Sequence, residues 1–235
     1  YGDFSGYSDI AIGASRLFGF NLMQNFAFPY FSRDIAEFWR RWHISLSTWF
    51  RDYLYIPLGG SRGGAMMKVR NTFIIFIVSG FWHGANWTFI VWGALNAIYF
   101  LPILLTNRNR KNIDTVASGR LFPSPNEFLS MGATFGLTVI AWVFFRAENM
   151  GHAMAYISEI FSSSTFNIPE IRPRNTTLLI IGFLVIEWYG RGQQFAIQNL
   201  GIQWKRPFRY ALYYAIIILI FWFGGKEQEF IYFQF

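Results

Sequence analysis

Histidine side chains are the residues of this sequence best suited to chemistry, because the chain contains three of them and no cysteine. The lack of cysteine excludes a disulfide framework, a cysteine nucleophile and a thiolate metal site. His83 lies between Trp82 and Gly84, just before a long apolar stretch. Asn86 is a favoured N-cap for a helix beginning at Trp87, whose free N–H groups would point back toward His83. A general base beside such donors is the arrangement that acyl transfer needs.

His83 also has a structural interpretation, in which a neutral imidazole ties two helices together by a hydrogen bond. An ionisable residue within a membrane segment is by default a functional hypothesis, and Gly84 lets the backbone approach closely. We therefore expect His83 to be catalytic.

His43 lies forty residues earlier, in a run rich in tryptophan and arginine. If this run is one helix, Trp39, His43, Ser47 and Phe50 share a face. His43 would then be a second polar contact to an acyl donor, or an interfacial residue that bonds a backbone carbonyl, and spacing alone favours the latter. His152 is expected to be a solvated loop residue.

Other chemistry has weaker signals. The sequence contains no H-E-x-x-H, P-loop or G-x-S-x-G motif, and we expect no metal site. The Gly-rich run 58–64 is typical of a flexible turn, although it could also cradle a phosphate. Arg62, Lys68 and Arg70 could serve either a nucleotide-like carrier or anionic lipid, and composition does not choose between them.

The elements that carry these residues are expected to be membrane helices. The chain of 235 residues is 53% hydrophobic, 21% aromatic and only 14% charged, against roughly a quarter charged in a soluble domain. Residues 86–105 contain no charge and are long enough to cross a bilayer as a helix. The fold class is therefore all-α, a polytopic membrane helical bundle. The net charge of +7 is attributed to cytoplasmic loops, and no nucleic acid partner is expected.

Three later segments are predicted to be transmembrane helices: 128–146, 176–190 and 209–223. The loops between them alternate in charge, which places 106–127 and 190–209 in the cytoplasm and 147–175 and the C-terminus outside. Residues 71–105 should form a broken hairpin, since both flanks are basic. Its first arm, Asn71–Trp82, would be only about 18 Å long, so the turn is predicted to lie inside the membrane.

Residues 30–56 are predicted to form an amphipathic helix at the cytoplasmic interface, stopped by Pro57, with Glu37 and Arg41 paired one turn apart. The alternative is a helix packed inside the bundle with its charges in a polar cavity.

Several runs carry a family resemblance: 1–9, 38–60 (FWRRWHISLSTWFRDYLYIPLGG), 79–86 (SGFWHGAN), 142–147 (WVFFRA) and 230–235 (FIYFQF). With these runs the chain resembles the membrane-bound O-acyltransferases, and among them the bacterial alginate O-acetyltransferase branch. The resemblance implies that residues 1–235 are the C-terminal portion of a single transmembrane domain. It also implies a catalytic role for His83, in the W-H-G run, and for His43, in the R-W-H-x-S run. The substrate-binding residues expected around them are Trp82, Asn86, Trp39, Ser47 and Arg51.

The resemblance further implies transfer of an acetyl group from a cytoplasmic thioester such as acetyl-CoA, with no bound cofactor. The acceptor would be a hydroxyl of an exported polysaccharide such as alginate, sometimes reached through a periplasmic acetyltransferase partner. The location would be the bacterial inner membrane. Two alternatives stay open: D-alanyl transfer to teichoic acid, and a non-catalytic membrane subunit that conducts or docks a polymer or an acyl carrier.

Overall fold

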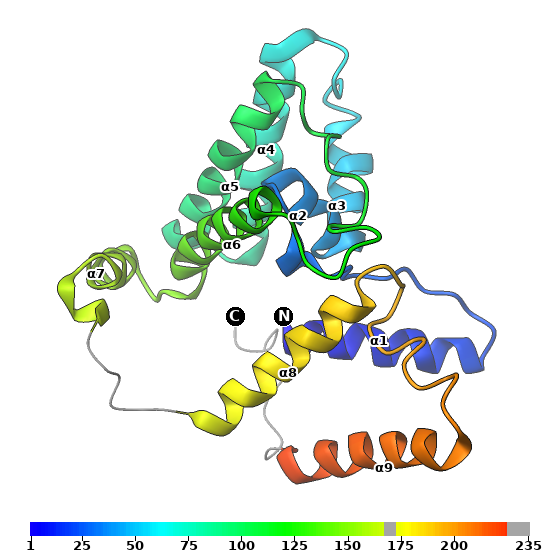
Figure 1. Ribbon diagram of the computed structural model, residues 1–235. Helices are drawn as coiled ribbons and strands as arrows, with labels where there is room; N and C mark the ends of the chain where they lie inside the picture. Colours follow the sequence, from blue (N-terminus) through cyan, green and yellow to red (C-terminus); the bar gives the residue numbers. More distant parts are fainter. Residues whose placement is uncertain (167–172, 225–235) are drawn as a thin grey trace. The chain divides into compact units, whose positions relative to one another are not determined.

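The computed structural model describes residues 1–166 and 173–224, which form helices and no strand (Figure 1). The chain divides into two compact units, 1–175 and 176–235, and each is considered by itself. The elements are α1 (Gly2–Leu17), η1 (Pro29–Phe31), α2 (Ile35–Arg41), α3 (Ile44–Phe50), η2 (Arg51–Tyr55), α4 (Gly64–His83), α5 (Trp87–Leu105), α6 (Pro125–Arg146), α7 (Met150–Ile160), η3 (Ser163–Phe166), α8 (Arg174–Gly190) and α9 (Arg206–Phe223).

Helices α4 and α5 form the predicted hairpin, and they pack closely because glycines lie at their crossing. A Cβ atom at Gly80 would collide with the backbone carbonyl of Phe89, and one at Gly93 with that of Phe76. Small residues at such positions let two helix backbones approach and pack over a long contact. The hairpin is therefore confirmed, with its turn at residues 84–86.

The first arm of the hairpin is longer than predicted, because α4 begins at Gly64 and includes Lys68 and Arg70. Its 20 residues span about 30 Å, so the argument that placed the turn inside the membrane was wrong. Lys68 Nζ donates to Asn107 Oδ1 at 3.3 Å, beyond the end of α5. The basic ends of both helices thus lie together, and His83 lies at the opposite end of the pair.

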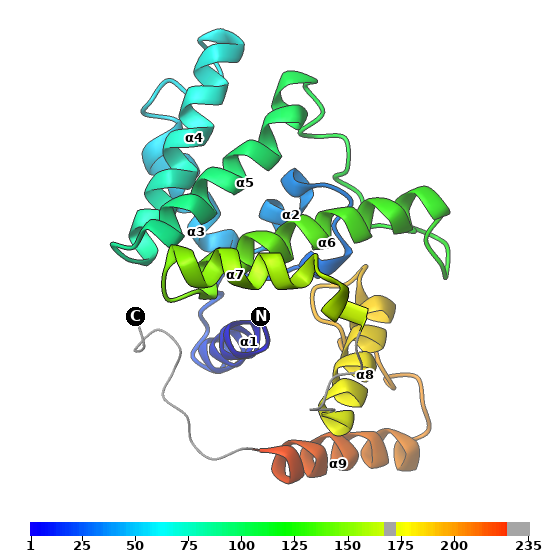
Figure 2. The ribbon, with the colours of Figure 1, turned by 90° about the vertical axis from the view of Figure 1, so that its left-hand side faces the viewer.

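Among the described residues, four helices are long and apolar enough to cross a membrane: α4, α5, α6 and α9. Helix α6 contains the predicted span 128–146 and begins with a capping box, in which Ser124 and Glu127 satisfy each other's backbone N–H groups. The loop expected at 147–175 contains a further helix, α7, which the sequence did not predict. Figure 2 shows α7 alongside α6, and the two helices share with α5 a buried core of Trp92, Ala141, Phe144 and Ala153.

Residues 30–56 do not form one helix. They are divided into the 3₁₀ turn η1, the short helices α2 and α3, and the π-helical turn η2. The break between α2 and α3 falls at Trp42, which is extended, and at His43, which has left-handed backbone angles (φ 44°, ψ 57°). The prediction of a continuous amphipathic helix was therefore wrong. The predicted pair of Glu37 and Arg41 is confirmed at 2.8 Å.

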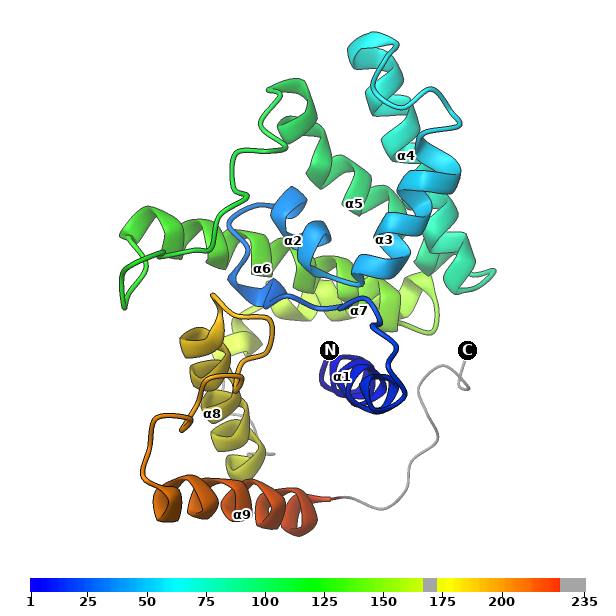
Figure 3. The ribbon, with the colours of Figure 1, turned by 90° about the vertical axis from the view of Figure 1, so that its right-hand side faces the viewer.

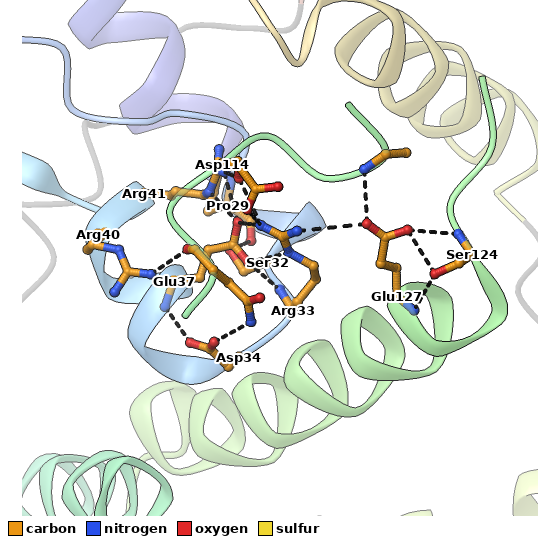
Figure 4. A network of polar contacts seen from close by, with 12 residues as sticks. Pro29, Ser32, Arg33, Asp34, Glu37, Arg40, Arg41, Asp114, Ser124 and Glu127 are labelled. Atoms are coloured by element: carbon orange, nitrogen blue, oxygen red, sulfur yellow. Dashed lines mark hydrogen bonds and ion pairs between the residues drawn. The ribbon is translucent and has the colours of Figure 1, made fainter. Parts of the chain in front are cut away.

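A buried ion-pair network holds α2 in place (Figure 4). The Glu37 side chain is 1% exposed and accepts five hydrogen bonds, from the backbone N–H and guanidinium of Arg33 and from the guanidinium of Arg41. Arg33 also bonds Asp114 at 3.0 Å and lies 3.7 Å from Glu127. The segment that follows α5 is thereby fixed to α2 and to the start of α6.

The second unit contains α9 and all but the start of α8, which cover the predicted segments 209–223 and 176–190. Helix α8 ends where Gly190 approaches the backbone of Ala196 too closely for a Cβ atom. Gly201, which has a positive φ of 74°, lies against Leu212 of α9. The run 230–235 quoted for the family resemblance lies outside the described residues, as does the predicted placement of the C-terminus.

Candidate active site

His83 is the last residue of α4, and aromatic rings surround it. Its ring lies 4.9 Å from Phe145 and 5.5 Å from Trp92, both edge-on, and 6.3 Å from Phe89. Phe89 and Trp92 belong to α5 and Phe145 to α6. Aromatic contacts from α5 and α6 therefore hold the imidazole in place at the end of α4, and the residue remains partly exposed.

Neither ring nitrogen of His83 makes a hydrogen bond within the described parts of the chain. A histidine that ties two helices together would show such a bond, so the structural interpretation finds no support in the geometry. Both nitrogens are free to meet a substrate group. An imidazole fixed by apolar contacts, with an accessible nitrogen, can take or give one proton.

The turn after His83 is built by Gly84 and Asn86. A Cβ atom at Gly84 would lie 2.7 Å from the Phe89 ring, so only glycine allows the close return. Asn86 caps α5 as predicted: its Oδ1 accepts from the Thr88 N–H at 3.1 Å, and its Nδ2 donates to the carbonyl of Glu148 at 2.9 Å. Asn86 is therefore a structural residue in this arrangement.

The expected cluster of free N–H donors at the start of α5 is largely used up. Thr88 donates to the Asn86 side chain and Phe89 to the Asn86 carbonyl. Of the first three N–H groups of α5, only that of Trp87 remains for a substrate oxygen within the described structure. A complete oxyanion hole would need a further donor from elsewhere.

His43 is held at the break between α2 and α3 by the segment that precedes η1. The Ala27 N–H donates to the carbonyl of Arg41 at 3.0 Å, and the Ile44 N–H donates to that of Asn25 at 3.0 Å. These two bonds flank His43 and fix its left-handed backbone, a conformation that costs about 1–3 kcal/mol for a residue other than glycine. Such outliers concentrate at functional sites, and histidine is among the residues that tolerate them best.

The surroundings of His43 keep its imidazole neutral. Phe4 of α1 packs edge-on at 4.7 Å, and Ser45 Oγ lies 3.5 Å from Nδ1. Burial and, to a smaller extent, the neighbouring His83 together lower the pKa of His43 to about 4. The ring is therefore uncharged at neutral pH and can accept as well as donate a hydrogen bond.

Within residues 1–175, the fold brings the segments that carry the two histidines together. Helix α3 and the turn η2 lie alongside α4 (Figures 1 and 3), with the rings of Trp49 and Trp82 6.4 Å apart. His83 lies near enough to contribute to the lowering of the His43 pKa. The two histidines singled out from the sequence therefore lie near each other in the fold.

The other predicted site residues divide between surface and packing positions. Trp82 is 65% exposed beside His83. Arg51 is exposed and paired with Asp52 at 2.7 Å. Trp39 instead donates to Asn96 Oδ1 of α5 at 3.2 Å, and Ser47 bonds the carbonyl of Trp42 at 3.4 Å. The expectation that Trp39, His43, Ser47 and Phe50 share one helix face was wrong, because the helix breaks at His43.

Sequence reasoning missed residues that the structure places at the site. Phe145 lies in the WVFFRA run, where only the family resemblance marked it. Asn25 and Ser45 support His43 through hydrogen bonds (Ser45 Oγ to Asn25 Oδ1, 2.6 Å). No local sequence pattern could predict this contact, because the two residues are twenty positions apart. His152 is exposed, as expected, but it lies in α7 and not in a loop. No group of His, Asp and Glu side chains in the described ranges is arranged to hold a metal ion.

Comparison with known proteins gives a consistent picture. Residues 1–144 match the membrane-bound O-acyltransferase family. The chain is 42% identical to the probable alginate O-acetylase AlgI of Pseudomonas aeruginosa, over 88% of this chain and 38% of that protein. It is 44% identical to the peptidoglycan O-acetyltransferase of Helicobacter pylori, over 66% of this chain and 28% of that protein. A teichoic acid D-alanyltransferase of Streptococcus thermophilus is 36% identical over 61% of this chain and 37% of that protein. The chain therefore spans well under half the length of these three relatives.

Proposed function

The chain belongs to the membrane-bound O-acyltransferase family, and on that premise we propose that its protein transfers an acetyl group from a thioester donor to a hydroxyl of an exported polysaccharide. The names of two relatives support an O-acetyl transfer: the match to the probable alginate O-acetylase covers 88% of this chain, and the match to the peptidoglycan O-acetyltransferase covers 66%. The D-alanyltransferase match is shorter and less identical, so D-alanyl transfer is the second candidate.

The observation that carries the proposal is that His83 has a fixed ring whose nitrogens make no hydrogen bond within the described structure. A sugar hydroxyl is a poor nucleophile at neutral pH, so a base must take its proton as it attacks the thioester carbonyl. His83 has two nitrogens without a partner in the described structure and an aromatic enclosure that fixes the ring. We assign His83 as this base, which afterwards returns the proton to the leaving thiolate.

The charge distribution supports a donor that approaches from the cytoplasm. Arg62, Lys68 and Arg70 lie at the basic end of the α4–α5 pair, and basic residues gather on the cytoplasmic side of membrane proteins. The phosphates of acetyl-CoA would be attracted to this basic end. In a bacterial inner membrane the basic end of the α4–α5 pair would face the cytoplasm. The acceptor, or an acetyltransferase partner that relays the group, would then meet His83 from the opposite side, past the exposed Trp82.

His43 would contribute a second hydrogen bond to the bound substrates, since it is neutral and close to His83. Exposed Arg51 is retained as a substrate contact. Asn86, Trp39 and Ser47 would act only by supporting the helices that hold the site, because their polar atoms are bonded within the protein.

The test uses membranes that contain the full-length protein, supplied separately with labelled acetyl-CoA and with D-alanine in its activated form. Acetyl label in the polysaccharide fraction, or in an acetyltransferase partner, supports the proposal. Incorporation of D-alanine alone would replace it with the second candidate. If neither group is transferred in membranes where the protein is folded and its partners are present, the protein is a non-catalytic membrane subunit.

A further inference from the structure

Asn25 is held in one orientation by the backbone of α3. Its Oδ1 lies 3.2 Å from the backbone N of Ser45, and its Nδ2 lies 3.4 Å from Ser8 Oγ of α1. A backbone N–H can only donate, so the atom that faces it must be the amide oxygen. A flipped amide would set two donors against each other. The acceptor end of Asn25 therefore points at Ser45.

The direction of the next hydrogen bond follows from this orientation. Ser45 Oγ lies 2.6 Å from Asn25 Oδ1, and because an amide oxygen only accepts, the serine hydroxyl must donate its single proton there. The same Oγ lies 3.5 Å from Nδ1 of His43. With its proton already used, Ser45 can only accept from the histidine.

We propose that Asn25 and Ser45 are positioning residues that hold His43 as the tautomer with a proton on Nδ1, which leaves Nε2 as a hydrogen-bond acceptor. This inference deepens the proposed function, on whose two-histidine site it rests. The group that His43 recognises is then an N–H, O–H or S–H donor of the bound substrates, and never one of their carbonyl or phosphate oxygens.

The backbone around His43 supports the same reading. The bonds from Ala27 to Arg41 and from Ile44 to Asn25 hold the left-handed residue on both sides. The segment that carries Asn25 thus fixes both the main chain and the tautomer of His43. Burial also keeps the imidazole neutral, and only a neutral ring has a tautomer to select, because a charged one donates from both nitrogens.

The tautomer can be observed directly from the ring nitrogens of His43. The full-length protein, labelled with ¹⁵N-histidine and reconstituted in lipid, should give one pair of ring signals for His43, identified as the pair that disappears in His43→Gln. We expect His43 to show a protonated Nδ1 and an unprotonated Nε2. Ser45→Ala should shift this ratio by roughly 5-fold to 30-fold, as for loss of one or two kcal/mol. Ser45→Thr, which keeps the hydroxyl, should restore it.

A matched control is Thr138→Val, which removes a buried hydroxyl that bonds only the carbonyl of Thr134 in its own helix. It should leave the His43 signals unchanged. A proton on Nε2 of His43 in the parent protein would overturn the proposal, and this result needs no variant to fold. An unchanged tautomer in folded Ser45→Ala would overturn it as well. If the expected signals are found in a protein that transfers no acyl group, the proposed function is contradicted. The proposal that Asn25 and Ser45 set the tautomer of His43 is still supported.

Discussion

Replacing Glu37 with glutamine should destabilise the protein strongly, although the change is nearly isosteric. The Glu37 carboxylate is 1% exposed and faces two guanidinium groups whose side chains are 8% and 17% exposed, those of Arg33 and Arg41. Removing one partner of a buried ion pair leaves the other charge uncompensated and typically costs about 3–5 kcal/mol. Arg33 keeps Asp114, and Arg41 keeps the carbonyl of Ala27, so we expect the lower end, about 3 kcal/mol.

The assay is reversible unfolding in mixed micelles, followed by the fluorescence of the ten tryptophans. The matched control is Asp52→Asn, which breaks an ion pair of similar length whose two side chains are 59% and 41% exposed. Solvent screens that pair, so its loss should leave the unfolding midpoint nearly unchanged. If Glu37→Gln lowers the free energy of unfolding by less than about 1 kcal/mol, the value of an exposed pair, then the network does not hold α2.

Three further predictions concern the same fold. The Arg33 guanidinium lowers the pKa of Asp114, so this carboxylate stabilises the folded state above its unfolded pKa. Its contribution to the unfolding free energy is lost as the pH falls through the folded pKa. Asp114→Asn should therefore flatten the decline in unfolding free energy between about pH 5 and pH 2. Gly93→Leu would force a side chain against the backbone of Phe76 and should cost about 1–3 kcal/mol in the same unfolding assay, or more if the hairpin opens. A cysteine at Lys111, in this otherwise cysteine-free chain, should resist an impermeant maleimide in intact cells, and labelling there would reverse the proposed topology.

The hairpin and the later helices could be predicted because long apolar runs and their caps are local signals. Asn86 marks the start of α5, and the Ser124–Glu127 pair marks that of α6. The boundaries were less certain. The predicted first arm of the hairpin began only at Asn71, yet Lys68 and Arg70 also lie within α4. Their long side chains reach polar partners beyond the helix.

The break at His43 could not be predicted, because it depends on contacts far away in the sequence. Trp39, His43 and Ser47 have helical spacing, and local propensity favours continuing the helix. The bonds from the segment around Asn25 and Ala27 override that preference. The hydrogen bonds from Asn25 to Ser45 and on to His43 could not be predicted for the same reason, since Asn25 and Ser45 come into contact only in the folded chain.

The proposal that His83 is the catalytic base is tested by the rate of acyl transfer per folded molecule of His83→Gln, measured in the full-length protein. His152→Gln is the control, because His152 is exposed on α7. We expect His83→Gln to accumulate to the level of the parent and to transfer acyl groups roughly 10² to 10⁴ times more slowly, the usual contribution of general acid–base catalysis. The control should keep the parent rate. A folded His83→Gln protein that turns over at the parent rate would show that His83 is not the base.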